Sequence, residues 1–492
     1  MAVIPKPNGP SARLEGSFRL PDGLAVDMGG FAPWCAAAFR ERAGLAELGR
    51  GTPWLVLRRD SALPAEGYRL TVEPMRVTAE AKEERGVIWA LTTLSGLLGP
   101  GGTAPCCRIE DRPRFPRRGL CLDCARHFFP LPVLKRVIEG MSQAKLNVFH
   151  WHLTDDQGWR LESRLVPADG GERYTQAEVR ELTEFARMRG VEIVPELDLP
   201  GHVSALLAVR PELGCPGRTA ARETGSGIRD AALCAGREET YDFLAELLEE
   251  VCGLFPGPCV HLGGDEVRGL WWRSCPRCRE KMAREGLGST AALQGYFTSR
   301  VSAILEGLGK RPIWWNDVLR SGPGPEGALI QSWTPRYCRQ TAAHIRRGGA
   351  WLHSDLFALY LDYPHALLPL ERVYRSAPAG AGGGLLGLEA CLWTERTADE
   401  ETLTARLFPR LPALAEAAWT ERLDYGDFLS RLEPRPGWTP REGWDPSGPA
   451  ARREAAAYLA AFRGENGAPA WPGLPMLGRF ITNFGLRAVH FH

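Results

Sequence analysis

The chain has no long hydrophobic run and almost no net charge. None of its 492 residues lies in a stretch approaching the ~18 uninterrupted apolar residues that a membrane-spanning helix requires, so we expect no membrane anchor. Its 60 Lys and Arg are balanced by 59 Asp and Glu, which leaves a formal charge of +1. Without a broad electrostatic field, recruitment of nucleic acid or of an anionic membrane surface is not expected.

A secretory signal and internal repeats are also missing. The opening residues, MAVIPKPNGPSARLEG, contain neither an apolar segment nor a small-residue cleavage site. The 13 cysteines are an odd number, and in a chain without a signal we expect most of them to be reduced, which favours the cytoplasm. Apolar residues at 44% and charged residues at 24% are ordinary for a globular protein and exclude a disordered, collagen-like or coiled-coil chain.

The first part of the chain has the pattern of a small α+β domain, for which we predict residues 1–112. Trp54–Arg59 and Gly67–Thr78 are expected as short alternating strands bounded by Gly and Pro. A helical segment follows at Glu83–Leu98 and ends at a Gly-Pro-Gly sequence. The proline-rich stretch Asp111–Pro116 is the expected linker to the next domain.

Residues 113–433 alternate between short β-rich runs and helical stretches. Eight strands in such alternation predict a parallel (β/α)8 TIM barrel, and so an α/β fold class. The predicted strands are Gly119–Cys124, Asn147–Leu153, Val191–Leu197, Cys259–Gly263, Arg311–Trp315, Ala328–Trp333, Ala350–Ser354 and Leu385–Trp393. Residues 434–492 are expected to form a C-terminal extension of unknown role with one helix near Ala450–Phe462.

Charged residues, His and Trp occur at nearly every predicted strand end. In a (β/α)8 barrel the reactive groups lie at the C-terminal ends of the strands, so this concentration predicts an active site at that face. The residues concerned are Asp123, Arg126, His150, His152, Asp155, Glu196, Asp198, His202, Asp265, Glu266, Trp315, Asp317, Trp333, Asp355, Tyr360, Asp362, Glu389, Trp393 and Glu395.

The sharpest motif is His261–Val267 (HLGGDEV). Its two glycines permit unusual backbone dihedral angles just before two adjacent acids, Asp265 and Glu266. Both carboxylates can then turn toward one pocket, where two close negative charges raise one pKa and prepare a general acid. The alternative is structural: Asp-Glu opens many helices as an N-cap followed by a first-turn acid.

Histidines mark two further strand ends. His150 and His152, two residues apart, share one strand face and are candidate metal ligands, with Asp155, His202 or Asp265 completing the shell. The alternative, which we favour, is that both histidines are hydrogen-bonding residues in a polar barrel interior. His202 follows a Pro-Gly turn that can present it toward the same face.

Four aromatic residues near the strand ends allow two interpretations, a binding box or ordinary packing. Trp315, Trp333, Tyr360 and Trp393 lie at or beyond different strands. They can form a small box for a methyl or acetyl group or a sugar face, or they can simply pack between the barrel and its helices.

Cys275 and Cys278 have the spacing of half a zinc site or of a redox pair. A four-cysteine site would need Cys121 and Cys124 to join them, so ordinary thiols are expected.

At these motifs the sequence resembles glycoside hydrolase family 20, the β-N-acetylhexosaminidases. RGLCLDCARHFF (118–129), KLNVFHWHLTDDQGWR (145–160), PELDLPGH (195–202) and HLGGDEV (261–267) are similar to the family's successive signatures, in the family's order. QSWT (331–334), YLD (360–362) and GLEACLWTE (387–395) extend the resemblance to the last strand. The resemblance spans roughly residues 50–430.

The resemblance implies an exo-acting enzyme that removes terminal β-linked GlcNAc or GalNAc by a retaining mechanism, in which the substrate's acetamido oxygen forms an oxazolinium ion. It implies that Glu266 is the general acid/base, that Asp265 orients the acetamido group and that Tyr360 donates to its oxygen. Trp315, Trp333 and Trp393 match the aromatic walls, Arg126, Asp362 and Glu395 match the residues that hold the distal hydroxyls, and Asp155 and His202 match the pair behind the general acid.

The expected partner is a small oligosaccharide or glycoconjugate, with no cofactor and no metal. Two alternatives stay open: a metal-dependent barrel hydrolase using the histidines, and a carbohydrate-binding relative without catalysis. The Arg- and Gly-rich segment 211–239 does not align with the family pattern and follows the third strand, where it can shape the leaving-group side of the pocket. Oligomeric state and the preference for GlcNAc or GalNAc cannot be read from the sequence.

Overall fold

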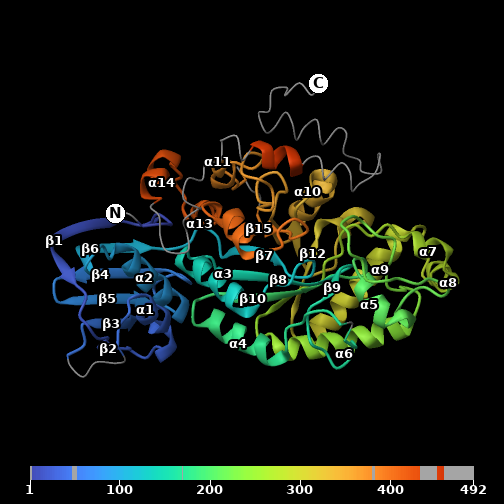
Figure 1. The fold of residues 1–492 in the computed structure, drawn as a ribbon, viewed down its shortest axis with the longest axis horizontal. Helices are drawn as coiled ribbons and strands as arrows, with labels where there is room; N and C mark the ends of the chain where they lie inside the picture. Colours follow the sequence, from blue (N-terminus) through green and yellow to red (C-terminus); the bar gives the residue numbers. More distant parts are fainter. Residues whose placement is uncertain (1–2, 47–51, 169, 379–382, 433–451, 459–492) are drawn as a thin grey trace.

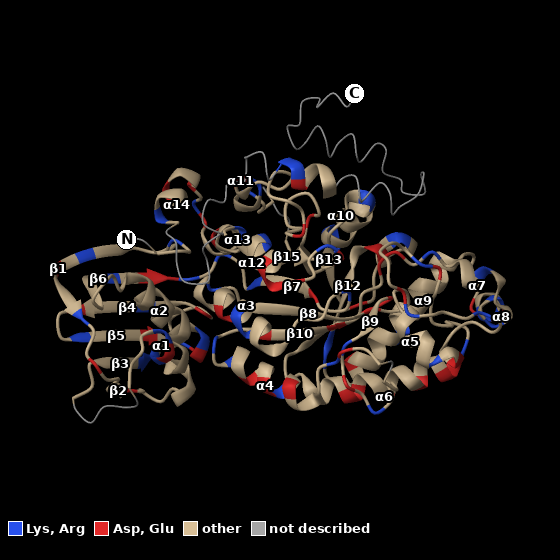
Figure 2. Cartoon of the chain, viewed as in Figure 1, with Lys and Arg blue, Asp and Glu red and all other residues tan. Residues whose placement is uncertain are grey.

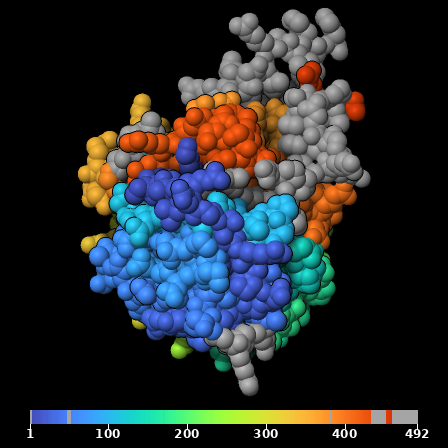
Figure 3. Space-filling view, turned by 90° about the vertical axis from the view of Figure 1, so that its left-hand side faces the viewer, coloured from blue at the N-terminus to red at the C-terminus, as the bar shows by residue number. Residues whose placement is uncertain are grey.

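The computed structural model describes residues 3–46, 52–168, 170–378, 383–432 and 452–458. It consists of an N-terminal α/β domain packed beside a closed barrel (Figure 1). Figure 3 views the molecule from the side of the N-terminal domain, whose blue surface lies below the orange surface of later residues. In the described ranges no helix combines the length and the apolarity that crossing a bilayer demands. Positive and negative side chains are interspersed along the chain (Figure 2).

The N-terminal domain is a six-stranded sheet in the order β1-β6-β4-β5-β3-β2, with α2 packed on it. The run Gly67–Thr78, predicted as strand, contains a hairpin in which β4 pairs antiparallel with β5. The elements are β1 (Ser11–Arg19), β2 (Val26–Asp27), η1 (Pro33–Ala36), α1 (Ala37–Arg42), β3 (Leu55–Arg59), β4 (Tyr68–Glu73), β5 (Arg76–Ala81), α2 (Glu84–Leu97) and β6 (Thr103–Asp111).

The predicted barrel is confirmed. Eight parallel strands close because β10 pairs with both β8 and β11, and β15 pairs with β7. They are β7 (Arg117–Asp123), β8 (Val148–Asp155), β10 (Glu192–Leu197), β11 (Cys259–His261), β12 (Arg311–Trp315), β13 (Leu329–Ser332), β14 (Trp351–His353) and β15 (Leu385–Leu392); the short β9 (Gly158–Trp159) adds antiparallel to β8.

Helices on the outside connect these strands. Some fill long connections that showed no clear periodicity in the sequence. They are α3 (Leu131–Gln143), α4 (Gln176–Arg187), α5 (Ser204–Val209), η2 (Pro211–Leu213), α6 (Glu238–Leu254), α7 (Leu270–Ser274), α8 (Pro276–Arg284), α9 (Thr290–Gly307), η3 (Asn316–Ser321), η4 (Pro335–Tyr337), α10 (Cys338–Arg346), α11 (Leu370–Tyr374), α12 (Glu400–Leu407), α13 (Arg410–Trp419) and α14 (Tyr425–Arg431).

The barrel interior is layered because inward-facing residues alternate along each strand. One layer is apolar and includes Val148, Val194 and Ile313. Two residues further along β8 and β10, His150 and Glu196 bring polar groups into the interior, and both side chains are buried. This order of layers places the ionisable side chains of His150 and Glu196 at the depth where the floor of a pocket begins.

A buried ion-pair network joins the two domains. Glu66, whose backbone φ is +59°, accepts hydrogen bonds from Arg118 at 2.5 Å, Asn147 at 2.8 Å, Arg85 at 2.9 Å and Trp89 at 3.0 Å. Arg118 and Asn147 belong to the barrel side of the interface. Although burial alone would raise it, the two guanidinium groups, Arg118 first, lower the pKa of Glu66 to about 2.

We expect Glu66→Gln to lower the free energy of unfolding by about 3 kcal/mol at pH 7, because it leaves buried arginines without their counter-charge. A carboxylate with a lowered pKa stabilises the folded state above its ordinary pKa of 4.5, and this contribution is lost as the pH falls toward about 2. Urea unfolding at several pH values should therefore show the two proteins converging in acid. Glu80→Gln, at a partly exposed pair with Arg69, should cost under about 1 kcal/mol; an equal loss in both variants would contradict the prediction.

Candidate active site

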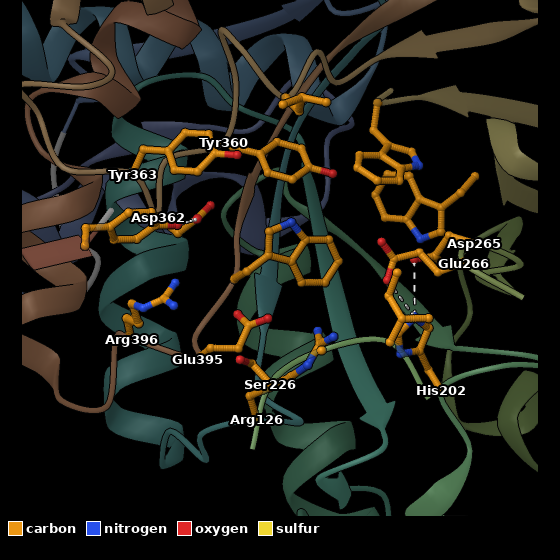
Figure 4. A pocket seen from close by; sticks show the side chains of 17 residues that line it. Arg126, His202, Ser226, Asp265, Glu266, Tyr360, Asp362, Tyr363, Glu395 and Arg396 are labelled. Carbon is orange, nitrogen blue, oxygen red and sulfur yellow. Dashed lines mark hydrogen bonds and ion pairs between the residues drawn. The ribbon is translucent and has the colours of Figure 1, made fainter. Parts of the chain in front are cut away.

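A pocket of about 180 Å³ opens at the C-terminal ends of the barrel strands (Figure 4). It brings together the residues of several distant motifs. Its lining comprises Arg126, His202, Ser226, Gly227, Ile228, Asp265, Glu266, Trp315, Trp333, Leu356, Tyr360, Asp362, Tyr363, Trp393, Glu395, Arg396 and Tyr458. All the residues to which the family resemblance assigns a role line the pocket except Asp155, which lies behind the lining.

The glycine pair after β11 turns the two acids into the pocket. Gly263 has φ +67°, and a Cβ there would lie 1.8 Å from Asp198 Oδ1; Gly264 has φ +91° and donates its N–H to that same oxygen at 3.2 Å. Glu266 itself has φ +51°, a strained conformation for a residue with a side chain. The helix-cap interpretation of Asp265 and Glu266 is wrong, because the next helix, α7, begins at Leu270.

His202 sits between the acids and a second carboxylate pair. Its Nε2 lies 3.5 Å from Glu266 Oε2 and 3.7 Å from Asp265 Oδ2, and its Nδ1 lies 3.2 Å from Asp155 Oδ1 and 3.3 Å from Asp156 Oδ2 (Figure 4). Burial alone would lower the pKa of His202, but the carboxylates around it, Asp155 foremost, raise that pKa well above its ordinary value. A charged imidazolium therefore bridges the pocket acids and the buried carboxylates.

Acids crowd this side of the pocket and shift one another's pKa. Burial raises the pKa of Asp265 to about 6. The attraction of His202 opposes this shift, and the negative charges of Glu266 and Glu196 add to it. Burial and the charge of Asp265 raise the pKa of Asp317 to about 7. Asp317 also accepts hydrogen bonds from the Glu266 backbone N–H at 3.3 Å and from the Trp333 indole at 2.7 Å. It thus holds both a pocket acid and an aromatic wall in place.

The two histidines of β8 have their ring nitrogens committed to carboxylates. His150 lies 2.7 Å from Glu389 through Nδ1 and 2.9 Å from Glu196 through Nε2. His152 lies 2.5 Å from Glu196 through Nδ1 and 3.1 Å from Asp155 through Nε2. Burial alone would lower the pKa of His150, but Glu196 and Glu389 raise it to about 9. A histidine that donates from both nitrogens has no lone pair for a metal, which supports the hydrogen-bonding interpretation over metal ligation.

Four aromatic side chains form the opposite wall. Trp333 stacks near Tyr360 with ring centroids 6.1 Å apart and an interplanar angle of 19°. Trp393 lies 6.1 Å from Tyr360 and 6.0 Å from Trp315, tilted by 55° and 53°. These rings make an apolar box whose polar atoms are the hydroxyl and the indole N–H groups.

Charged groups gather at the far end of the pocket. Arg126 Nη2 lies 2.7 Å from Asp155 Oδ2, and its guanidinium lies 5.2 Å from the centroid of the Trp393 ring. Glu395 is exposed to the pocket. Burial and the nearby Glu395 raise the pKa of Asp362 to about 7. This end can donate and accept several hydrogen bonds to a polyol.

Tyr458 is a pocket residue that the sequence did not reveal. It belongs to the helical residues 452–458, and the rest of the predicted helix Ala450–Phe462 lies outside the described residues. Its hydroxyl donates to Asp362 Oδ2 at 3.0 Å, and its ring packs edge-on against Tyr363 at 5.7 Å. The extension beyond the barrel therefore reaches the pocket. Nothing in its local sequence signals this, because the contact spans 96 positions.

Other residues in or directly behind the lining differ in how clearly the sequence pointed to them. Asp317 stood at a predicted strand end, two positions after Trp315, so the strand-end rule points to it. Residues 226–228, from the segment that does not align with the family pattern, form another part of the wall. That they lie on the leaving-group side stays a prediction. Tyr363 and Arg396 each follow a recognised motif by one residue.

Comparison with known proteins agrees with this geometry. The family model described as glycosyl hydrolase family 20, catalytic domain, matches residues 115–422, and that of domain 2 of the family matches residues 1–112. The β-hexosaminidase of Porphyromonas gingivalis is 33% identical over 419 residues, which cover 76% of this chain but only 54% of that protein. The β-hexosaminidase of Vibrio furnissii is 32% identical over 466 residues, covering 84% of this chain and 76% of that one.

Among solved structures, the exo β-N-acetylglucosaminidase of Vibrio harveyi in complex with N-acetylglucosamine matches with a TM-score of 0.79 and 29% identity. The match covers 96% of this chain and 78% of that one. The barrel, its pocket and these relatives together define a glycoside hydrolase. Because the catalytic-domain model spans the whole barrel, the chain belongs to glycoside hydrolase family 20.

Proposed function

We propose that the enzyme is an exo-acting β-N-acetylhexosaminidase that releases terminal, non-reducing β-linked GlcNAc or GalNAc from a small oligosaccharide or glycoconjugate. The observation that carries the proposal is the adjacent pair Asp265 and Glu266 facing an aromatic box in one pocket. The cavity of about 180 Å³ is smaller than the roughly 300–1,000 Å³ usual for larger ligands, which favours a single sugar.

The proposed binding mode follows the two ends of the pocket. Trp315 and Trp333 enclose the acetamido methyl group, and Trp393 lies under the sugar ring, where aromatic faces meet C–H groups. At the far end Arg126, Asp362 and Glu395 bind the distal hydroxyls. Tyr458 already donates to one oxygen of Asp362, so it restricts which hydroxyl arrangement that carboxyl accepts.

In the first step the acetamido oxygen of the substrate attacks the anomeric carbon while the glycosidic C–O bond breaks. Glu266 gives its proton to the leaving oxygen. Asp265 accepts the acetamido N–H and stabilises the positive charge that develops on the oxazolinium ring, and Tyr360 donates to the acetamido oxygen. The nucleophile comes from the substrate, so no enzyme carboxylate forms a covalent bond to the sugar.

In the second step a water molecule attacks the same carbon from the side the leaving group vacated. Glu266, now a carboxylate, takes the water proton, the oxazolinium ring opens and the β configuration is retained. His202, charged and linked to Asp155, lies 3.5 Å from Glu266 Oε2, where its positive charge stabilises the carboxylate that this step starts from. The reaction consumes one water and needs no cofactor.

The proposal is tested by comparing an aryl β-N-acetylglucosaminide with the matching aryl β-glucoside, which lacks the acetamido group. We expect kcat/KM to be at least ~10³ higher for the first substrate, because only it carries the intramolecular nucleophile. Equal turnover of both substrates would contradict the mechanism. Immediate loss of activity in EDTA would favour the metal-dependent hydrolase, and saturable sugar binding without turnover would favour the binding-only relative.

A further inference from the structure

Four buried cysteines from three separate segments meet outside the pocket. Cys215 follows η2, Cys234 precedes α6, and Cys275 and Cys278 begin α8, at the end of the barrel away from the N-terminal domain (Figure 1). Each has 2% or less of its surface exposed. Their four sulfur atoms all lie within 4.8 Å of one another.

We propose that these four cysteines bind a structural zinc ion. A tetrahedral zinc with Zn–S bonds of about 2.3 Å separates its sulfur atoms by about 3.8 Å. The Sγ–Sγ distances are 3.7 Å for Cys234 and Cys278, 3.8 Å for Cys234 and Cys275, and 3.9 Å for Cys215 and Cys278. A disulfide requires about 2.05 Å, so these pairs are separate thiols at the spacing of a metal site.

The local backbone is arranged to bring the sulfur atoms together. Cys275 is the N-cap of α8, Pro276 occupies the first turn and Cys278 follows within that turn, so both sulfur atoms lie at a helix N-terminus that favours thiolates. Gly236 lets its own loop approach this helix: a Cβ there would fall 2.3 Å from the carbonyl carbon of Arg277.

The other half of the site is a turn at Cys215. Gly217 has φ +72°, and the Arg218 N–H donates to the Cys215 carbonyl at 3.1 Å, which reverses the chain directly after the cysteine. The Cys234 N–H donates to the Leu213 carbonyl at 2.8 Å, next to an isolated antiparallel bridge. This pairing of the backbone therefore holds Cys215 and Cys234 close together, although they are far apart in the chain.

The site holds the two ends of the loop that forms part of the pocket wall. Cys215 and Cys234 bracket the segment whose residues 226–228 line the pocket. Between the cysteines and the pocket, Trp272 donates to the Leu233 carbonyl at 2.8 Å, and Arg268 pairs with Asp230 at 3.0 Å. A metal at the cysteines would clamp this loop to α7 and α8, which directly follow the catalytic acids in the chain.

The proposed metal site has a structural role and not a catalytic one. All four ligands are protein sulfur atoms, which leaves no open position for water, and none of them lines the pocket. The sequence analysis expected ordinary thiols, because a four-cysteine site seemed to need Cys121 and Cys124. The structure instead groups Cys275 and Cys278 with Cys215 and Cys234, two cysteines from the segment that does not align with the family pattern. Cys121 instead contacts Cys391 inside the barrel.

The test is the metal content of the full chain, purified without a metal-binding tag and measured by inductively coupled plasma mass spectrometry. We expect one zinc per chain in the wild type and at least a tenfold lower content in Cys234→Ser and Cys278→Ser. Cys338→Ser, which changes an exposed cysteine, should keep its zinc. Protein produced with cobalt should show the visible absorption bands of tetrahedral sulfur-bound Co²⁺, a readout that needs no variant to fold.

A wild-type chain without stoichiometric zinc, with stoichiometric iron, or with a disulfide among these cysteines by mass spectrometry would overturn the proposal. Metal content is independent of turnover, so failure of the hexosaminidase assay would leave this result standing. Brief EDTA treatment should leave activity unchanged, whereas removal of the metal under prolonged chelation should lower the melting temperature and raise KM. A catalytic metal would instead give immediate loss of kcat.

Discussion

Replacement of Glu266 by glutamine should lower kcat for an aryl β-N-acetylglucosaminide by a factor of about 10²–10⁴. Glutamine keeps the size of the side chain but can neither give a proton to the leaving oxygen nor take one from water. The backbone of Glu266 has φ +51°, and its N–H donates to Asp317. Because the substitution changes neither feature, we expect the variant to keep the same conformation. Steady-state kinetics checks the expected loss.

The size of the loss should depend on the leaving group. A dinitrophenolate needs little protonation, so the first step should be much less affected in Glu266→Gln than with a methylumbelliferyl or alkyl leaving group. The exposed Glu326→Gln serves as the matched control and should keep wild-type kinetics. Turnover of the Glu266 variant within tenfold of wild type on every substrate would refute the acid/base role.

Asp265→Asn should reduce kcat by about 10²–10³, because it removes the charge that stabilises the oxazolinium ion. Asp265 lies 3.7 Å from His202 Nε2 at the base of the pocket, where a neutral amide cannot replace a carboxylate facing positive charge. We expect a smaller effect on the affinity for the sugar product than on kcat. Kinetics and product binding measured on the same preparation separate the two.

The pH dependence supplies a second readout of Asp265. Its pKa is raised to about 6 by burial, by Glu266 and by Glu196, against the effect of His202; Asp198 and Asp317 also lie in this acidic cluster. The reaction needs the carboxylate, so kcat/KM should fall as the pH drops below about 6. This acid limb should be lost or displaced in Asp265→Asn and unchanged in the exposed Asp242→Asn. An identical limb in wild type and Asp265→Asn would assign it to another group.

Much of the fold was predictable because its signals are local. The eight barrel strands were recognised within a few residues, and β12 coincides with the predicted Arg311–Trp315. Strands buried between helices are short apolar runs, and Gly and Pro mark their ends. The strand-end rule predicts one region for Arg126, His202, Asp265 and Trp393, and all four line the same pocket.

Prediction was weaker where the pattern depends on tertiary packing. The edge strand β1 is almost wholly exposed, so it carries little of the alternation that marks a half-buried strand. The helices α12 and α13 are adjacent, and α13 is buried on all sides, which removes the polar face that would mark its period. The choice between metal ligation and hydrogen bonding for His150 was likewise decided by Glu196 and Glu389, which lie far away in the chain.

The sequence by itself determined the class of fold, the family and the chemistry-bearing motifs, because these depend on residue types at short, regular spacings. Only the tertiary structure decided that Tyr458 reaches Asp362, that Glu66 anchors the N-terminal domain to the barrel, and that Cys215 and Cys234 join Cys275 and Cys278. These contacts join positions about 40 to 100 residues apart. No local period encodes such pairs; the closure of the barrel and the path of its long loops bring them together.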